Sequence, residues 1–411
     1  MTTDNAFLIT NVSLFDGTGA VVQENQAIVV AGRRIDWIGP ADEAPSFPRE
    51  KTRDGSGLTA IPGMTNCHVH LCNDGAKDLF AQVATDTVTR ASVRAASNMA
   101  ATLNAGITTV RDCGAADGIV IELAKCEVDG LIAGPRIKAA GRVITMTGGH
   151  GHMIGRQADG PAGVTAATRA ELAGGADFIK AMATGGVLTP GVDPQQTALQ
   201  VDELQAVARE AHNAGKRATT HAIGGQGIKN AMKAGIDSIE HGFYLDDEAL
   251  ETAVSQGTYL IPTLIAVNRI VDNGDSIPGW VVKKAEAESG HHRESFIAAL
   301  RSGMKIAAGT DAGTPFNPHA DLAAELETMV EFGMSATEAL LAATRNAAEN
   351  LDLLHDLGTL EVGKLADIVL VHGDPTSDIS TTRNVVFVCK EGVVSRDEIG
   401  GGHGSDQTND H

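Results

Sequence analysis

The residues best suited to chemistry are histidines, a lysine and an aspartate that each end or follow a short apolar run. They are His68, His70, Lys180, His221, His241 and Asp311. Imidazole and carboxylate groups are common ligands of transition metals in proteins. On an extended segment, side chains two residues apart share a face, so His68 and His70 could hold the same ion. The residue types and their placement therefore predict a metal site.

Short apolar runs, each followed by a helical stretch, would position these residues. The runs span residues 59–65, 107–111, 136–140, 178–181, 217–221, 238–240, 259–262 and 305–308. Buried strands that alternate with helices predict a parallel sheet, and this number of units predicts an α/β fold of the (β/α)₈ TIM-barrel type. A doubly wound open sheet would need a glycine-rich phosphate loop after its first strand, where this chain has His68-Val69-His70. The barrel is therefore favoured, with the active site at the carboxyl ends of its strands.

Both ends of the chain return to short strands separated by turns. Such strands cannot form stable cores separately, so we expect them to pair with each other. The prediction is a small composite β-sandwich from residues 1–57 and 366–396, beside a barrel over residues 58–365. Residues 397–411 are polar and glycine-rich, which predicts a disordered tail.

Composition narrows the class of protein. The chain of 411 residues has 32 basic and 52 acidic side chains, a net charge of −20, which argues against nucleic acid as a partner. It is 43% hydrophobic without a continuous apolar run long enough for a membrane span, and its acidic start does not resemble a signal peptide. The five cysteines form no CxxC pair, which is typical of reduced thiols. We therefore expect a cytoplasmic protein that acts on a small molecule and makes no contact with membranes.

The same residues resemble the metal-ligand set of the amidohydrolase superfamily. Segments 106–112 and 363–369 support the resemblance, which runs from about residue 7 to residue 395. Within the superfamily, segments 147–151, 180–186 and 239–247 are most similar to the imidazolonepropionase-like, metal-dependent dipeptidase branch. That branch includes prolidase-like, Xaa-Arg dipeptidase and ochratoxin-amidase-like members. Its members are often homo-oligomers, which is the expectation here.

The resemblance implies two divalent metal ions, with zinc expected, bridged by carboxylated Lys180. His68, His70 and Asp311 would bind the more buried ion, and His221 and His241 the second. An ammonium cannot ligate a cation, whereas a lysine carbamate can. A hydroxide bridging the ions would attack the scissile carbonyl, and Asp311 would pass its proton to the leaving amine.

The resemblance also suggests residues that contact the substrate. His150 would stabilise the developing oxyanion, with His152 as its near neighbour, and Tyr244 could reach the substrate. Prolidase-like members carry a tyrosine where this chain has Ile223, so recognition of a substrate carboxylate is not assured. Arg156 is a candidate replacement for that carboxylate clamp, the alternative being a solvated surface arginine.

One further pair, Arg111-Asp112, follows the second run and is interpreted as a structural ion pair below the site.

The predicted function is binuclear, metal-dependent hydrolysis of the amide bond of a dipeptide or N-acyl amino acid, of the Xaa-Pro or Xaa-Arg dipeptidase or carboxypeptidase kind. One alternative is hydrolysis of a non-peptide amide, arylamide, carbamate or cyclic amide, which Ile223 leaves open. A mononuclear deaminase or imidazolonepropionase-type enzyme is disfavoured by Lys180. A relative that has lost catalysis is disfavoured by the complete set of candidate ligands.

Overall fold

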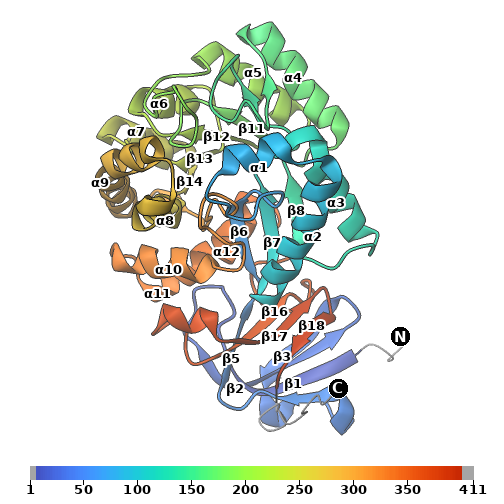
Figure 1. Ribbon diagram of the computed structural model, residues 1–411. Coiled ribbons are helices and arrows are strands. Elements are labelled where there is room, and N and C mark those ends of the chain that lie inside the picture. The colour runs from blue at the N-terminus through green and yellow to red at the C-terminus, as the bar shows by residue number, and fades with distance from the viewer. Residues whose placement is uncertain (1–5, 400–411) are drawn as a thin grey trace.

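A computed structural model describes residues 6–399 of the chain. A sheet built from both chain ends lies beside a larger part in which helices surround parallel strands (Figure 1). Of the predicted disordered tail, Asp397 ends a strand, and residues 400–411 lie outside the described residues. Within the described part of the chain, no helix is long and apolar enough to cross a membrane.

The sheet at the chain ends is mixed and eight-stranded, with the order β18-β17-β16-β5-β1-β2-β3 and with β4 paired to β1. Its strands are β1 (Ala6–Leu14), β2 (Gln23–Ala31), β3 (Arg34–Pro40), β4 (Thr52–Asp54), β5 (Leu58–Pro62), β16 (Ile368–His372), β17 (Val385–Lys390) and β18 (Val393–Asp397). Strand β5 joins the two ends of the chain, because it pairs parallel with β1 and antiparallel with β16.

The predicted strand over residues 59–65 is in fact two strands with different partners. Strand β5 belongs to the sheet of the chain ends, whereas β6 (Met64–Val69) pairs with β7 of the larger part. Gly63 separates them, and a Cβ at this glycine would lie 2.2 Å from Oγ1 of Thr108. The sheet of the chain ends therefore reaches Pro62, beyond the expected boundary at residue 57.

The larger part contains two parallel sheets. One has the order β6-β7-β8 and the other β10-β9-β11-β12-β13-β14-β15. Their remaining strands are β7 (Ile107–Asp112), β8 (Arg136–Ala139), β9 (Ile144–Thr145), β10 (Arg156–Gln157), β11 (Ile179–Met182), β12 (Ala218–Ala222), β13 (Ser238–His241), β14 (Tyr259–Ile261) and β15 (Lys305–Ile306). Every residue of β11, β12, β13 and β14 is buried, as expected for parallel strands covered on both faces.

Backbone hydrogen bonds connect the two parallel sheets. The N–H of Cys67 donates to the carbonyl of Ala308 just after β15, at 2.8 Å. On the other side, the N–H of Asp177 donates to the carbonyl of Ala139 at the end of β8, also at 2.8 Å. The carboxyl ends of both sets of strands therefore meet around one centre.

Helices follow most of the parallel strands and pack around them (Figure 1). They are α1 (Leu79–Thr85), α2 (Val88–Asn104), α3 (Ile119–Val128), α4 (Gly160–Gly174), α5 (Val201–Asn213), α6 (Gly225–Lys233), α7 (Asp247–Gln256), α8 (Leu264–Asp272), α9 (Gly279–Ser302), α10 (Leu322–Glu331), α11 (Ala336–Ala342) and α12 (Arg345–Asn350). Short 3₁₀ turns are η2 (Ala41–Glu43), η3 (Arg49–Lys51), η4 (Ala116–Gly118), η5 (Gly274–Ser276) and η6 (Ile379–Arg383). Local sequence sets several helix starts: the Asp246 side chain, for example, accepts from the N–H of Ala249 and caps α7.

Candidate metal centre and active site

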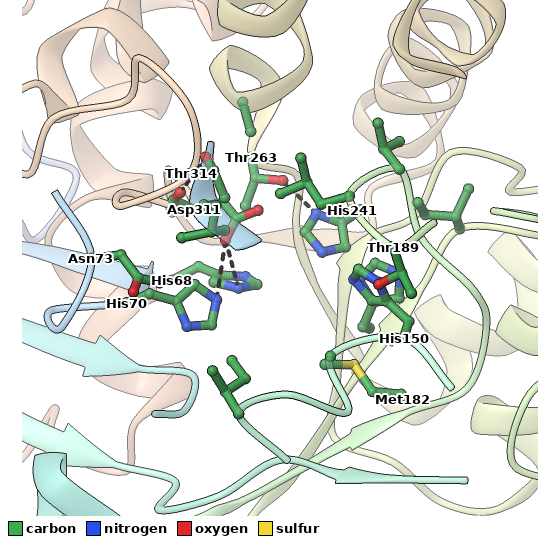
Figure 2. A pocket seen from close by; sticks show the side chains of 18 of the residues that line it. His68, His70, Asn73, His150, Met182, Thr189, His241, Thr263, Asp311 and Thr314 are labelled. Atoms are coloured by element: carbon green, nitrogen blue, oxygen red, sulfur yellow. Dashed lines mark hydrogen bonds and ion pairs between the residues drawn. The ribbon is translucent and has the colours of Figure 1, made fainter. Parts of the chain in front are cut away.

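The predicted ligands come together in one cavity at the carboxyl ends of the parallel strands. Its lining includes His68, His70, Lys180, His221, His241 and Asp311, together with His150 and His152. The rings of His68 and His70 converge on the Asp311 carboxylate (Figure 2), with each Nε2 3.3 Å from Oδ1. Ring centroids of His221 and His241 are 4.5 Å apart, and those of His68 and His241 5.2 Å apart.

The outer ring nitrogens of His68, on strand β6, and of His70, directly after that strand, are held by fixed acceptors. Nδ1 of His68 lies 2.7 Å from Oε2 of Glu240, and Nδ1 of His70 lies 2.8 Å from the carbonyl oxygen of Gly114. Carboxylates and carbonyls accept hydrogen bonds, so each Nδ1 carries the proton. The lone pair of each ring is therefore on Nε2, which faces Asp311.

The histidines of β12 and β13 are oriented in the same way. Nε2 of His221 donates to the carbonyl of Gly185 at 2.7 Å, which leaves its Nδ1 with the lone pair. Nδ1 of His241 lies 2.7 Å from the hydroxyl of Thr263, and that hydroxyl donates to the carbonyl of Pro262 at 2.6 Å. The hydroxyl has only one proton, so Nδ1 of His241 is the donor and its Nε2 has the lone pair. An outer hydrogen bond that fixes the ring is typical of metal-ligating histidines.

Lys180 is the feature of the cavity that most needs a partner. It lies within β11, its side chain is 1% exposed, and its Nζ makes no hydrogen bond within the described part of the chain. A buried ammonium without a partner is unfavourable, whereas a carbamate on the same nitrogen would be a ligand for cations. The surroundings of Lys180 therefore fit a carbamate on its Nζ with cations bound to it.

Burial and neighbouring charges set the protonation of the site in a form suited to metal binding. Burial, with the charge of Lys180, lowers the pKa of His68 to about 4. Burial also holds the pKa of both His221 and His241 well below the usual value. For Asp311, burial would raise the pKa, but His68 and His70 outweigh it and lower the pKa. Neutral imidazoles and an ionised carboxylate are the forms that bind divalent cations. His70 differs from the other three histidines: burial would lower its pKa, but the hydrogen bond to Asp311 and the charge of that carboxylate outweigh burial and raise it, so a cation would have to displace a proton there.

Three residues of the site have positive φ angles. They are His241 (72°), Thr263 (54°) and Asp311 (58°), and each follows or ends a strand. Such angles are uncommon for residues other than glycine and are unfavourable for a β-branched residue such as Thr263. Backbone strain of this kind concentrates at functional sites, where the surrounding structure maintains it.

The sequence did not identify Glu240 as part of the site. It is fully buried and accepts hydrogen bonds from His68, from the hydroxyl of Thr219 and from Arg111, whose Nη2 is 2.5 Å from Oε1. Burial would raise the pKa of Glu240, but the Arg111 charge outweighs it and holds the pKa low. The sequence feature that could have pointed to Glu240 was its position directly before the candidate ligand His241.

The interpretation of Arg111-Asp112 as an ion pair is wrong. Arg111 pairs with Glu240, whereas the Asp112 carboxylate accepts from the N–H groups of Leu71 and Gly114 at 2.7 and 2.8 Å. Neighbouring residues of a strand point to opposite faces, which is why these two side chains do not meet.

His150 lies beside His221 in the cavity, with ring centroids 4.4 Å apart. Figure 2 shows His150 beside Thr189. Its Nδ1 is 2.7 Å from the hydroxyl of Thr189, and burial lowers the pKa of His150 to about 4. His152 also lines the cavity, and its Nδ1 lies 3.0 Å from the carbonyl oxygen of Gly149.

The other two predicted substrate-binding residues lie apart from the described lining of the cavity. Nε of Arg156 donates to Glu171 at 2.6 Å, which does not support Arg156 as a carboxylate clamp. Tyr244 stacks on His291 with ring centroids 4.6 Å apart, and its hydroxyl accepts from Gln195 at 2.9 Å. Neither residue is among the described lining of the cavity, although Tyr244 packs against the buried cluster of Val187, Ile223 and Phe243 that does line it.

The family model for the amidohydrolase family matches residues 59–395, so the chain belongs to the amidohydrolase family. Ochratoxinase from Aspergillus niger is 28% identical over 96% of this chain and 88% of its own length. Imidazolonepropionase from Acidiphilium cryptum is 27% identical over 86% of this chain and 89% of its own length. The solved structure of a Xaa-Pro dipeptidase with bound methionine superimposes with a TM-score of 0.88 and 34% identity, covering 95% of this chain and 99% of that one.

These findings confirm the predicted superfamily and its imidazolonepropionase-like, dipeptidase-containing branch. The chain is a hydrolase that acts on carbon–nitrogen bonds, specifically on amides. The family generally uses metal ions, in agreement with the cluster of His68, His241 and Asp311, whose ligand atoms lie within 4.8 Å of one another.

Proposed function

We propose that the chain hydrolyses an amide bond with two divalent metal ions, zinc being the expected metal, bridged by carboxylated Lys180. His68, His70 and Asp311 would hold one ion, and His221 and His241 the other. The single observation that carries this proposal is the set of outer hydrogen bonds, which leave one lone pair on each imidazole directed into the same cavity. The unpartnered Nζ of Lys180 supplies the position for the bridging group.

Divalent ions in such a site activate water near neutral pH and polarise the scissile carbonyl. The chain's own residues would complete the reaction. Asp311, ionised and 3.3 Å from Nε2 of both His68 and His70, would accept the proton of the attacking water and pass it to the leaving amine. His150, whose Nδ1 is engaged by Thr189, would donate from Nε2 to the developing oxyanion.

The proposal includes the architecture predicted from the sequence. The two parallel sheets, joined by hydrogen bonds at both margins, support a (β/α)₈ barrel, and the sheet of the chain ends supports a composite second domain. The proposal keeps the predicted composite β-sandwich, with β5 as the link between the chain ends.

Two substrate classes fit this reaction. The Xaa-Pro dipeptidase among the similar structures supports a dipeptide or N-acyl amino acid as the substrate. The burial of Ile223 in the cavity lining supports the alternative, a non-peptide amide, arylamide, carbamate or cyclic amide.

The proposal also covers location and assembly. The cysteines, all free and most of them buried, support a reducing compartment such as the cytoplasm. A homo-oligomer is proposed from the likeness to the branch, and light scattering on the purified protein tests it.

The test of the metal site is a metal count on purified wild type, Lys180→Ala and the control Lys283→Ala, a variant of an exposed lysine on α9. We expect two ions per chain in wild type and control, the mass of one CO₂ on Lys180 in native mass spectrometry, and loss of both metal and amidase activity in Lys180→Ala. One ion per chain with an active Lys180→Ala would instead support the mononuclear alternative.

A further inference from the structure

Much of the cavity wall around the histidine cluster is apolar, and this apolar part comes from separate parts of the chain. The polar side chains of the lining outside the candidate ligands are uncharged amide and hydroxyl groups and imidazoles, Asn73, Thr189, Thr263, Thr314, His150 and His152. Helix α1 contributes Phe80 and Val83, the loop after β11 contributes Val187 and Leu188, and helix α8 contributes Val267 and Ile270. Val187, Val267 and Ile270 are fully buried against Ile223 and Phe243 in one cluster. Three elements thus supply hydrocarbon surface to the space that a substrate beside the metal site would occupy.

The cations nearest to this wall are already paired. Nζ of Lys284, on α9, donates to the backbone carbonyls of Thr189 at 2.9 Å, Val192 at 2.5 Å and Gly186 at 3.4 Å. An ammonium has three donors, so these carbonyls use all of them. On α8, Arg269 pairs with Asp321 outside the cavity. Lys180 is the cation within the described lining, and the proposed carbamate would remove its charge.

The carboxylates at and behind the cavity also have partners already. Asp311 is the carboxylate within the described lining, and His68 and His70 both contact it. Glu240 lies behind the cavity and pairs with Arg111. A substrate ammonium at the apolar wall would therefore face hydrocarbon, as would a substrate carboxylate, and burying either charge without a partner is unfavourable.

From these contacts we infer that the substrate carries apolar, uncharged groups on both sides of the scissile bond, as an arylalkyl or aryl amide does, and is not a zwitterionic dipeptide. The inference rests on the proposed amide hydrolysis. Leu188 is a determinant open to substitution, because its side chain is half-buried at the loop and lines the cavity.

The test uses the metal-loaded enzyme and four amides that differ only in charge. They are 3-phenylpropanoyl-2-phenylethylamide, the same acyl group on phenylalanine, phenylalanine 2-phenylethylamide, and phenylalanyl-phenylalanine. We expect kcat/KM to be highest for the uncharged amide and to fall by at least about tenfold for each added charge. Preference for any of the three charged substrates over the uncharged amide would overturn the inference and leave the proposed function standing. Turnover of none of the four by enzyme with its full metal content would contradict the proposed function itself.

A variant of a wall residue tests whether this apolar wall determines the preference for uncharged substrates. Leu188→Arg places a cation at the wall and is expected to raise kcat/KM for the acyl-phenylalanine severalfold relative to the uncharged amide. The matched control is Val254→Arg, on the exposed surface of α7, which should leave the ratio unchanged. An unchanged ratio in Leu188→Arg that retains its fold and metal content would contradict the role of this wall in specificity.

Discussion

Nδ1 of His68 lies 2.7 Å from the Glu240 carboxylate, and both side chains are almost completely buried. Through this contact a residue behind the cavity fixes which nitrogen of His68 faces Asp311. Because Glu240 also pairs with the buried Arg111, one carboxylate serves both the candidate metal centre and the core.

Glu240→Gln is therefore expected to weaken metal binding as well as the fold. The amide keeps the shape but not the charge, so metal affinity should fall by about 10–100-fold. Leaving Arg111 without its charge partner should reduce the free energy of unfolding by on the order of 3–5 kcal/mol. Metal titration and denaturant unfolding measure the two effects, with the exposed Glu248→Gln as the control. A loss of stability with unchanged metal affinity would show that Glu240 has a structural role only.

Thr263 tests whether the orientation of His241 matters. Thr263→Val keeps the size and the β-branch but removes the hydroxyl that accepts from Nδ1 of His241. We expect metal affinity to fall by about tenfold or more, because the ring loses its fixed orientation. Thr263→Ser retains the hydroxyl and should bind metal as wild type does. Equal metal binding by the two variants would contradict this role.

Lys284 holds the loop that carries Thr189 and Gly185, the partners of His150 and His221. Lys284→Met should loosen this loop and lower kcat by roughly 10–100-fold through misplacement of His150. Metal content should remain near that of wild type, and the neighbouring exposed residue provides the control, Lys283→Met. If kcat is unchanged while stability falls, the loop contacts do not position His150.

Glu325 makes the stability of the fold depend on pH. It is buried and accepts from the N–H groups of Leu264 and Ile265 at the start of α8, and burial raises its pKa from 4.5 to about 8. A raised pKa means that the folded state favours the protonated form. Its contribution to stability is complete below about pH 4.5 and is lost as the pH rises through about 8.

Glu325→Gln removes this titration. The free energy of unfolding is measured at about pH 5.5 and at about pH 8.5. Linkage predicts that it falls less between these two pH values for the variant than for wild type. The difference between the two proteins isolates Glu325, because every other group titrates in both. Parallel decreases in the two proteins would mean that Glu325 is ionised throughout this range.

The sequence determined which residues could bind metal, because their types and their positions at strand ends are local properties. His68-x-His70, the histidines after the later strands and Asp311 all line the cavity as expected. Most strands could also be predicted from the sequence, because buried parallel strands appear as continuous apolar runs. The exception was the run over residues 59–65, where Gly63 divides it between two sheets whose pairing no local pattern reveals.

The tertiary structure alone decided the partners of those residues. Glu240 meets His68 and Arg111 across separations of 172 and 129 residues, and Lys284 on α9 reaches Thr189 in the loop after β11. Arg156 and Tyr244 were expected at the site from their loops, whereas in the structure Arg156 pairs with Glu171 and Tyr244 bonds Gln195, and neither is among the described cavity lining. Local spacing specifies which face of a strand a side chain occupies, whereas its contacts depend on which distant segments pack against that face. The candidate ligands were therefore readable from the sequence, whereas packing set the orientation of each of their side chains.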